Sequence, residues 1–137
     1  ASRAIVDGIL LQGVEFDVVG GPTLGADALT IGIAGIQRCR WFFVRKKPKG
    51  RGTNKLIEGS PIGDGDRCLV VEDAITTGGS LLKAIDAVEA TGAKVVAVST
   101  LVDRGEIARP LIESREILYY PLATYLDLGI EPVEIPS

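Results

Sequence analysis

One stretch, residues 67–82, constrains the fold of this chain more than any other. It reads RCLVVEDAITTGGSLL. Residues 68–71 are all apolar and predict a buried strand, because a short apolar run bounded by polar residues is typical of a parallel sheet. Two acids, Glu72 and Asp73, follow directly, and a Thr- and Gly-rich loop then leads into an apolar periodic segment. The stretch therefore predicts a strand, a polar loop and a helix in direct succession.

The loop of this stretch has the composition of a phosphate site. The first turn of a helix leaves backbone N–H groups without intrahelical partners, and these groups attract an anion together with the positive end of the helix dipole. Glycines let the backbone approach such an anion closely, and hydroxyl groups add further donors. The loop supplies both kinds of residue: Thr76, Thr77, Gly78, Gly79 and Ser80.

The two acids at the end of the strand indicate a sugar beside that phosphate. Carboxylates repel a phosphate, but they accept hydrogen bonds from vicinal hydroxyls and attract divalent cations. Glu72 and Asp73 therefore favour a phosphorylated ribose, with magnesium, as the ligand. The alternative is an ordinary strand-to-helix turn with a polar cap. The loop lacks the Gly-Lys-Ser/Thr of a P-loop and the three-glycine fingerprint of dinucleotide sites.

Composition narrows the class of protein. With 137 residues, 46% of them hydrophobic, the chain is expected to form a single domain over residues 1–137 with a substantial core. A net charge of −3 argues against a general nucleic-acid binder, and no apolar run is long enough to span a membrane. The two cysteines lack metal-ligand spacing, which predicts free thiols in a reducing cytoplasm. There is no histidine, which removes the usual general base. There is also no methionine, even at position 1, so we expect an N-terminal segment to be missing.

The remaining segments alternate between helical and strand patterns. Helices are predicted over residues 2–12, 26–35, 81–91, 106–113 and 122–128, and strands over residues 16–19, 41–44, 68–71, 94–102 and 116–120. This order predicts an α/β fold with a doubly wound, mostly parallel sheet and helices on both faces. In such a sheet ligands bind at the C-terminal ends of the strands, where residues 20–27, 45–55, 72–80 and 103–104 are expected to meet.

Residues 45–55 form the most basic segment of the chain. They hold six of its fifteen Lys and Arg residues and no acid: Arg45, Lys46, Lys47, Lys49, Arg51 and Lys55. Proline and glycines interrupt any helix here, so the segment is predicted to be a flexible loop. A solvated surface loop and a nucleic-acid contact are the alternatives. The sharper interpretation is a lid that brings positive charge onto a polyphosphate.

Four segments together resemble the type I phosphoribosyltransferases, and among them the orotate phosphoribosyltransferases. LVVEDAITTGGS resembles the family's phosphoribosyl-diphosphate motif, and FVRKKPKGRG resembles the catalytic-loop pattern Arg-Lys-x-x-Lys-x-His-Gly. LVDR resembles the strand end that faces the pyrimidine, and GGPTLGAD resembles the diphosphate-binding loop. The resemblance covers residues 14–104. The family's loop histidine is replaced by Arg51, and its N-terminal segment has no counterpart before Ala1.

The resemblance implies a role for each of these segments. Glu72 and Asp73 would hold the ribose hydroxyls, and the loop that follows would wrap the 5-phosphate with Ala74, Thr76, Thr77, Gly78, Gly79 and Ser80. The diphosphate would be bound by Thr23, Leu24, Arg45, Lys46, Lys49 and Arg51. Orotate would be bound by Thr76 and Arg104. The residues expected to act in catalysis are Lys49, Arg45, Lys46 and Asp73.

The resemblance also implies the reaction and its partners. Phosphoribosyl diphosphate and orotate would react to give orotidine 5′-monophosphate and diphosphate, with Mg²⁺ held mainly by the substrate and contacted by Asp73 through water. A homodimer is implied, with residues 45–55 of one subunit reaching the neighbouring site. Two alternatives remain open: a phosphoribosyltransferase for another nucleobase, for which Arg104 would have less use, and a non-catalytic regulator that senses phosphoribosyl diphosphate.

Overall fold

A computed structural model describes residues 1–50 and 56–134 of the chain. Within these residues one six-stranded sheet has the order β3-β2-β1-β4-β5-β6. All neighbouring strands are parallel except β2 and β3, which are antiparallel. The strands are β1 (Val18–Pro22), β2 (Arg40–Val44), β3 (Ile57–Gly59), β4 (Arg67–Ile75), β5 (Lys94–Asp103) and β6 (Leu118–Thr124).

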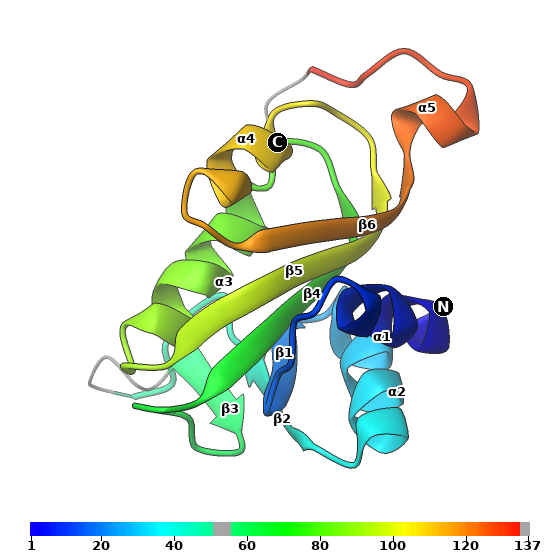
Figure 1. Cartoon of the computed structure of the whole chain (residues 1–137). Coiled ribbons are helices and arrows are strands. Elements are labelled where there is room, and N and C mark those ends of the chain that lie inside the picture. The colour runs from blue at the N-terminus through cyan, green and yellow to red at the C-terminus, as the bar shows by residue number, and fades with distance from the viewer. Residues whose placement is uncertain (51–55, 135–137) are drawn as a thin grey trace.

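Helices cover both faces of this sheet. The structure contains α1 (Ser2–Leu11), α2 (Asp27–Gln37), α3 (Gly79–Glu89), α4 (Ala108–Glu113) and α5 (Tyr125–Leu128). Figure 1 shows α1 and α2 on one side of the sheet and α3 and α4 on the other. Strand β4 contributes side chains to the cores on both faces of the sheet, because successive side chains of a strand point to opposite faces. Cys68 and Val70 join the core beneath α3 and α4, whereas Leu69 and Val71 join the core beneath α1 and α2.

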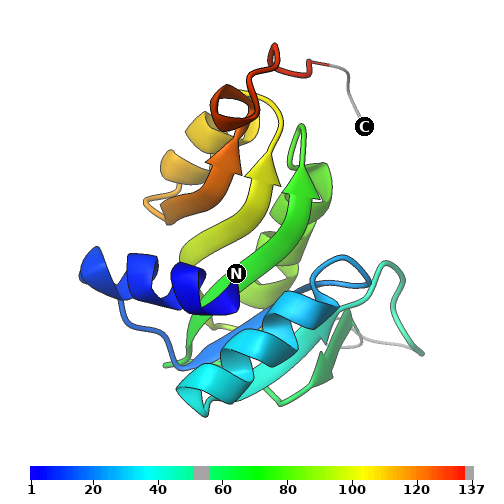
Figure 2. The same cartoon turned by 90° about the vertical axis from the view of Figure 1, so that its right-hand side faces the viewer.

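The connections place the ends of the parallel strands at one edge. From β1 the chain passes through α2 to β2 on one side, and from β4 it passes through α3 to β5 on the other, so the winding reverses between β1 and β4. This reversal is the topological switch point at which doubly wound sheets bind ligands. Figure 2 shows the arrowheads of β4, β5 and β6 at the same edge of the sheet, with α5 above them.

The predicted fold class is confirmed, while several predicted boundaries are wrong. Strand β1 was expected at residues 16–19 but continues through two glycines to Pro22. A Cβ at Gly20 would lie 2.5 Å from the Phe42 ring, and one at Gly21 would lie 2.0 Å from the carbonyl oxygen of Val71. These glycines therefore let β1 fit between its neighbours instead of marking a turn.

Three further differences concern the limits of strands and of a helix. Strand β4 was expected to end before the acids, but it runs to Ile75 and carries Glu72 and Asp73 within it. Strand β3 was not predicted, since three residues contain too little pattern to identify. The predicted helix at residues 122–128 is shortened to Tyr125–Leu128, because residues 122–124 pair with β5 as part of β6. Of the helices that the structure describes, none has both the length and the apolar character needed to span a membrane.

Candidate active site

A cleft of about 950 Å³ opens at the C-terminal edge of the sheet, beside the switch point. Its walls come from the ends of β1, β2 and β4 and from one side of α3. Of the residues singled out in the sequence, the lining includes Thr23, Leu24, Arg45, Lys46, Glu72, Asp73, Ala74 and Ser80. The fold thus brings together segments that are almost sixty positions apart in the sequence.

The acid pair lines this cleft near the end of β4. Glu72 is only 8% exposed, whereas Asp73 is exposed. The backbone N–H of Asp73 donates to Glu72 Oε1 at 3.1 Å, and the N–H of Ala74 donates to Asp73 Oδ1 at 2.7 Å. Thr100 on β5 donates its hydroxyl to the Asp73 carbonyl oxygen at 3.0 Å, which anchors the backbone of the pair.

The electrostatics of Glu72 distinguish it from an ordinary surface acid. Burial raises the pKa of Glu72 to about 7, and the nearby negative charge of Asp73 acts in the same direction. The positive charge of Lys46 and the hydrogen bond from the Asp73 backbone only partly oppose this shift. A buried carboxyl group with a pKa near neutrality, lying in a cleft, is typical of functional sites.

The loop after β1 lies directly against the two carboxylates. A Cβ at Gly25 would lie 2.4 Å from Glu72 Oε1 and 2.7 Å from Asp73 Oδ1, so only glycine leaves these oxygens in place. The backbone N–H of Thr23 donates to the carbonyl oxygen of Val44 at 3.1 Å, which ties the loop to the end of β2. The Thr23–Leu24 peptide bond is cis.

The start of the basic segment, which follows β2, also lines the cleft. The Arg45 guanidinium pairs with Glu58 on β3 at 3.0 Å, and the Arg45 N–H donates to the Leu56 carbonyl oxygen at 2.7 Å. Lys46 is exposed and lines the cleft. Lys49 is also exposed but does not belong to the lining. Arg51 and the rest of the predicted lid up to residue 55 lie outside the described residues.

The loop from β4 to α3 ends at the N-terminus of a helix. Gly78 is the N-cap of α3 with φ of 81°, a conformation that favours glycine. Gly78 has no side chain to cap the helix, and Thr77 Oγ1 accepts a long hydrogen bond of 3.4 Å from the Gly79 N–H. This turn, which includes Ser80, has the geometry that binds an anion through backbone N–H groups.

The fourth predicted segment lies at the end of β5. Arg104 is exposed, and its guanidinium donates to Thr76 Oγ1 at 2.9 Å. The backbone N–H of Arg104 donates to the Ile75 carbonyl oxygen at 2.9 Å, which joins the ends of β4 and β5. Arg104 and Thr76 are thus paired with each other, but neither belongs to the lining of the cleft.

Two residues beside the site were missed by sequence reasoning. Glu58 pairs with Arg45, and Tyr119 donates a hydrogen bond to the buried Asp103, which lies at a strand end that was expected to belong to the site. No local signal identifies Glu58 or Tyr119, because both contacts depend on how distant strands are arranged.

Comparison with known proteins agrees with this geometry. The phosphoribosyl transferase domain family matches residues 6–114. An orotate phosphoribosyltransferase of Thermococcus gammatolerans is 41% identical over 116 residues, covering 85% of this chain and 61% of that protein. One of Pyrococcus abyssi is 44% identical over 116 residues, covering 85% and 63%. This chain therefore spans less than two thirds of the length of these two relatives.

A solved structure supports the same relationship. The crystal structure of Mycobacterium tuberculosis H37Rv orotate phosphoribosyltransferase in complex with 5-phospho-alpha-D-ribosyl 1-diphosphate has a TM-score of 0.75 and 38% sequence identity to this chain. The match covers 94% of this chain and 74% of that one. The family resemblance inferred from the four sequence segments is confirmed. The chain belongs to the phosphoribosyl transferase domain family.

Proposed function

We propose that this protein transfers the phosphoribosyl group from phosphoribosyl diphosphate to orotate, a step of pyrimidine nucleotide synthesis that leads to UMP. A bond forms between a ring nitrogen of orotate and the anomeric carbon of the ribose, while the bond from that carbon to the diphosphate oxygen breaks. The bonding electrons leave with the diphosphate, which also takes up the proton of the ring nitrogen. The products are orotidine 5′-monophosphate and diphosphate.

The observation that carries this proposal is a single cleft lined by both acids and bases. Glu72 and Asp73 line it from the end of β4, and Arg45 and Lys46 line it from the residues that follow β2. A ligand with hydroxyl groups at one end and several negative charges at the other complements this arrangement. Phosphoribosyl diphosphate has both features, and the relatives named above carry the name orotate phosphoribosyltransferase.

The ribose and its 5-phosphate are assigned to the end of β4. Glu72 and Asp73 accept hydrogen bonds from the ribose hydroxyls, while the first turn of α3 receives the phosphate. The residues assigned to this half of the site are Glu72, Asp73, Ala74, Thr76, Thr77, Gly78, Gly79 and Ser80. This role of Glu72 requires its ionised form, which becomes dominant only above a pH of about 7 in the free protein.

The leaving diphosphate is assigned to the residues that follow β1 and β2. Thr23 and Leu24 offer backbone groups, and the cations Arg45, Lys46, Lys49 and Arg51 stabilise the charge that develops as the bond to ribose breaks. The transition state needs electrostatic stabilisation more than proton transfer, so the absence of histidine from the sequence is compatible with it. Closure of residues 45–55 over the cleft would exclude water that otherwise hydrolyses the sugar.

Magnesium fits this site as an ion held mainly by the substrate. No group of three or more His, Cys, Asp or Glu side chains that could hold a metal occurs in residues 1–50 and 56–134. The oxygens of Glu72 and Asp73 nevertheless converge where a Cβ on Gly25 would stand, and Mg²⁺ prefers a few carboxylates combined with substrate phosphates. Asp73 would contact the ion through water. When bound, the ion would neutralise part of the charge on the departing diphosphate.

Orotate is assigned to the end of β5. The Arg104 guanidinium can donate two parallel hydrogen bonds to the carboxylate of orotate, which distinguishes this base from uracil. Thr76 Oγ1, which already accepts from Arg104 at 2.9 Å, would add a contact to the ring. This pair is the reason to prefer orotate over a base that carries no carboxylate.

The assembly and the compartment are proposed on more general grounds. We place the protein in the cytoplasm as a homodimer whose residues 45–55 reach the neighbouring site; the dimer rests on the family resemblance. Both cysteines, Cys39 and Cys68, are free thiols, which suits a reducing compartment. The net charge of −3 gives no reason to propose a nucleic-acid partner.

The test is a direct assay of the reaction. Orotate, phosphoribosyl diphosphate and Mg²⁺ are mixed with the protein, and the loss of orotate absorbance is followed; release of diphosphate is measured in parallel so that uracil can be compared. Turnover that stops with EDTA, resumes with Mg²⁺ and fails when uracil replaces orotate is the expected result. Absence of turnover with orotate, or equal turnover with uracil, would contradict the proposal.

A further inference from the structure

The turn that carries Arg104 is held from several sides by the C-terminal part of the chain. Asp103 accepts hydrogen bonds from the Tyr119 hydroxyl at 2.6 Å and from the Gly105 N–H at 3.1 Å. The carbonyl oxygen of Arg104 accepts from the Val133 N–H at 2.7 Å. The turn is therefore fixed by β6 and by the segment after α5, neither of which lines the cleft.

The contact between Tyr119 and Asp103 is the buried part of this support. Asp103 is 3% exposed and Tyr119 is 5% exposed. The guanidinium of Arg109 on α4 lies over the Tyr119 ring, 4.9 Å from its centroid, and holds the ring in place. Burial, together with the bond to Asp103, raises the pKa of Tyr119, so its hydroxyl stays protonated and donates at all physiological pH values.

This support fixes the turn from which the Arg104 side chain projects. One carboxylate oxygen of Asp103 caps the Gly105 N–H and thereby shapes the turn, while the other is held by Tyr119. Arg104 lies between Asp103 and Gly105 in the sequence, and its guanidinium donates to Thr76 Oγ1. Because two parallel hydrogen bonds to a carboxylate tolerate little misplacement, a small movement of the turn weakens recognition of the base.

We propose that Tyr119, acting through Asp103, is a positioning residue that aims Arg104 at the carboxylate of the base. The proposal rests on the proposed function, since it concerns the orotate end of that site. It assigns to β6 a role in base selection, separate from the binding of phosphoribosyl diphosphate by the ends of β1, β2 and β4. Tyr119 itself touches neither substrate.

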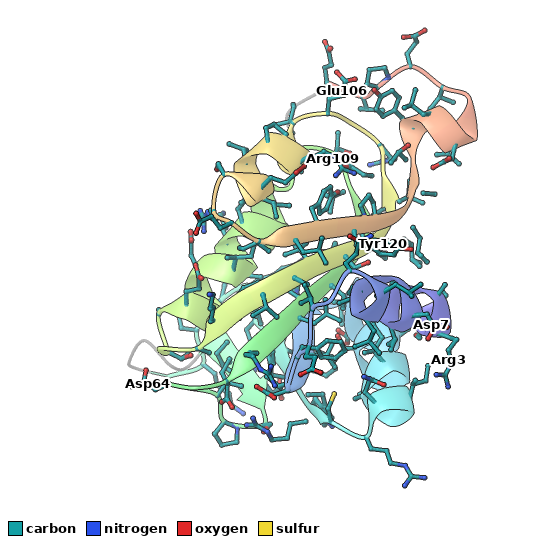
Figure 3. All side chains as sticks on the ribbon, viewed as in Figure 1. Arg3, Asp7, Asp64, Glu106, Arg109 and Tyr120 are labelled. Atoms are coloured by element: carbon teal, nitrogen blue, oxygen red, sulfur yellow. The ribbon has the colours of Figure 1, made fainter. Side chains whose placement is uncertain are left out.

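Tyr120 provides a matched control on the same strand. Its ring packs against α1, where a Cβ on Gly8 would meet it at 2.1 Å. Figure 3 shows Tyr120 beside α1, while Glu106 and Arg109 lie toward the end of the molecule that holds α4 and α5. A Tyr120→Phe variant therefore removes a hydroxyl from β6 without touching the turn at Asp103.

The experiment compares steady-state kinetics of the full chain with both substrates varied. Tyr119→Phe deprives a buried carboxylate oxygen of its donor, so we expect the KM for orotate to rise about tenfold. The kcat at saturating orotate and the KM for phosphoribosyl diphosphate should stay within about twofold of wild type. Tyr120→Phe should change none of these constants.

A double variant separates positioning from a general loss of structure. With Arg104→Ala present, Tyr119→Phe should raise the orotate KM no further, because its effect passes through the missing guanidinium. If the two effects multiply, or if Tyr119→Phe raises both KM values equally, the inference is overturned. If Tyr119→Phe alone does not fold, combining it with Asp103→Asn removes the same bond without leaving an unpaired charge, and the same outcomes apply.

The failure of the two proposals can be told apart. A wild-type protein that does not turn over orotate overturns the proposed function, and the positioning role falls with it. A wild-type protein that turns over orotate, while Tyr119→Phe leaves the orotate KM unchanged, overturns the positioning role alone.

Discussion

The two edges of the sheet use the same residue types in opposite ways. At the N-terminal edge, acids and bases neutralise each other. The Asp17 carboxylate accepts two hydrogen bonds from the Arg67 guanidinium, at 2.9 and 3.1 Å, and a third from the backbone N–H of Arg67. Arg40 is paired with Asp66 in the same region. At the C-terminal edge, Arg45 is paired with Glu58, but Glu72 lies beside a second acid in a cleft that Lys46 also lines.

The pKa values of the acids record this difference. Hydrogen bonds from Arg67 lower the pKa of Asp17 to about 2, whereas burial raises the pKa of Glu72 to about 7. An acid with a lowered pKa stabilises the folded protein through its partner, while one with a raised pKa destabilises the ionised folded protein. The paired Asp17 of the N-terminal edge thus contributes to stability, whereas an ionised Glu72 at the C-terminal edge reduces it.

The largest expected effect is a loss of turnover at the C-terminal edge. Lys49→Ala removes one of the cations assigned to the leaving diphosphate, and we expect kcat to fall by about 100- to 1000-fold with a smaller change in substrate binding. Steady-state kinetics with both substrates varied measure this. Lys94→Ala is the matched control, because Lys94 is an exposed lysine at the start of β5 on the opposite edge. Equal rates for the two variants would remove Lys49 from the mechanism.

The contrast between the edges also explains what could be predicted from the sequence. Glu72, Asp73 and the loop after them lie within one segment, so spacing alone indicated a site there. The convergence of four loops followed from the α/β pattern, because parallel strands end at a common edge. The cations of residues 45–55 were visible as a charge run.

Contacts between distant segments could not be predicted in this way. Glu58 meets Arg45 only because β3 folds back on β2, and three residues carry too weak a pattern to identify as a strand. Gly20 and Gly21 were assigned to a turn, since the tight packing that places them in β1 involves Phe42 and the backbone of Val71. The bond between Tyr119 and Asp103 likewise depends on how β6 lies against β5. The roles assigned to individual site residues stay predictions until the variants are measured.

A second effect is a difference in the pH dependence of stability. The pKa of Glu72 is raised in the folded protein from about 4.5 to about 7, so folding favours the protonated form, and stability falls as pH rises through this interval. Glu72→Gln keeps the shape and removes the titration. Relative to wild type, we expect it to add little to the free energy of unfolding below pH 4.5 and about 2 to 3 kcal/mol above pH 7.

Urea unfolding at a series of pH values between 4 and 8 measures this difference. Glu89→Gln is the control, because Glu89 is an exposed acid at the far end of α3 and its replacement should change stability little. A difference between Glu72→Gln and wild type that stays constant over the series would show that Glu72 does not titrate in this interval. The two edges would then differ in composition but not in electrostatics.

The smallest effect belongs to the N-terminal edge and has the opposite sign. Because its folded pKa is about 2 and its ordinary value is 3.8, Asp17 stabilises the protein above pH 3.8 and loses this contribution as pH falls toward 2. Its side chain is 33% exposed, so solvent screens the pair, and Asp17→Asn should cost only about 1 kcal/mol near neutral pH. Urea unfolding at pH 7 in low and high salt measures this cost, which should shrink with salt while kcat stays at the wild-type value. A fall in kcat would mean that the N-terminal edge shapes the site as well as the fold, and the division of labour between the two edges would no longer hold.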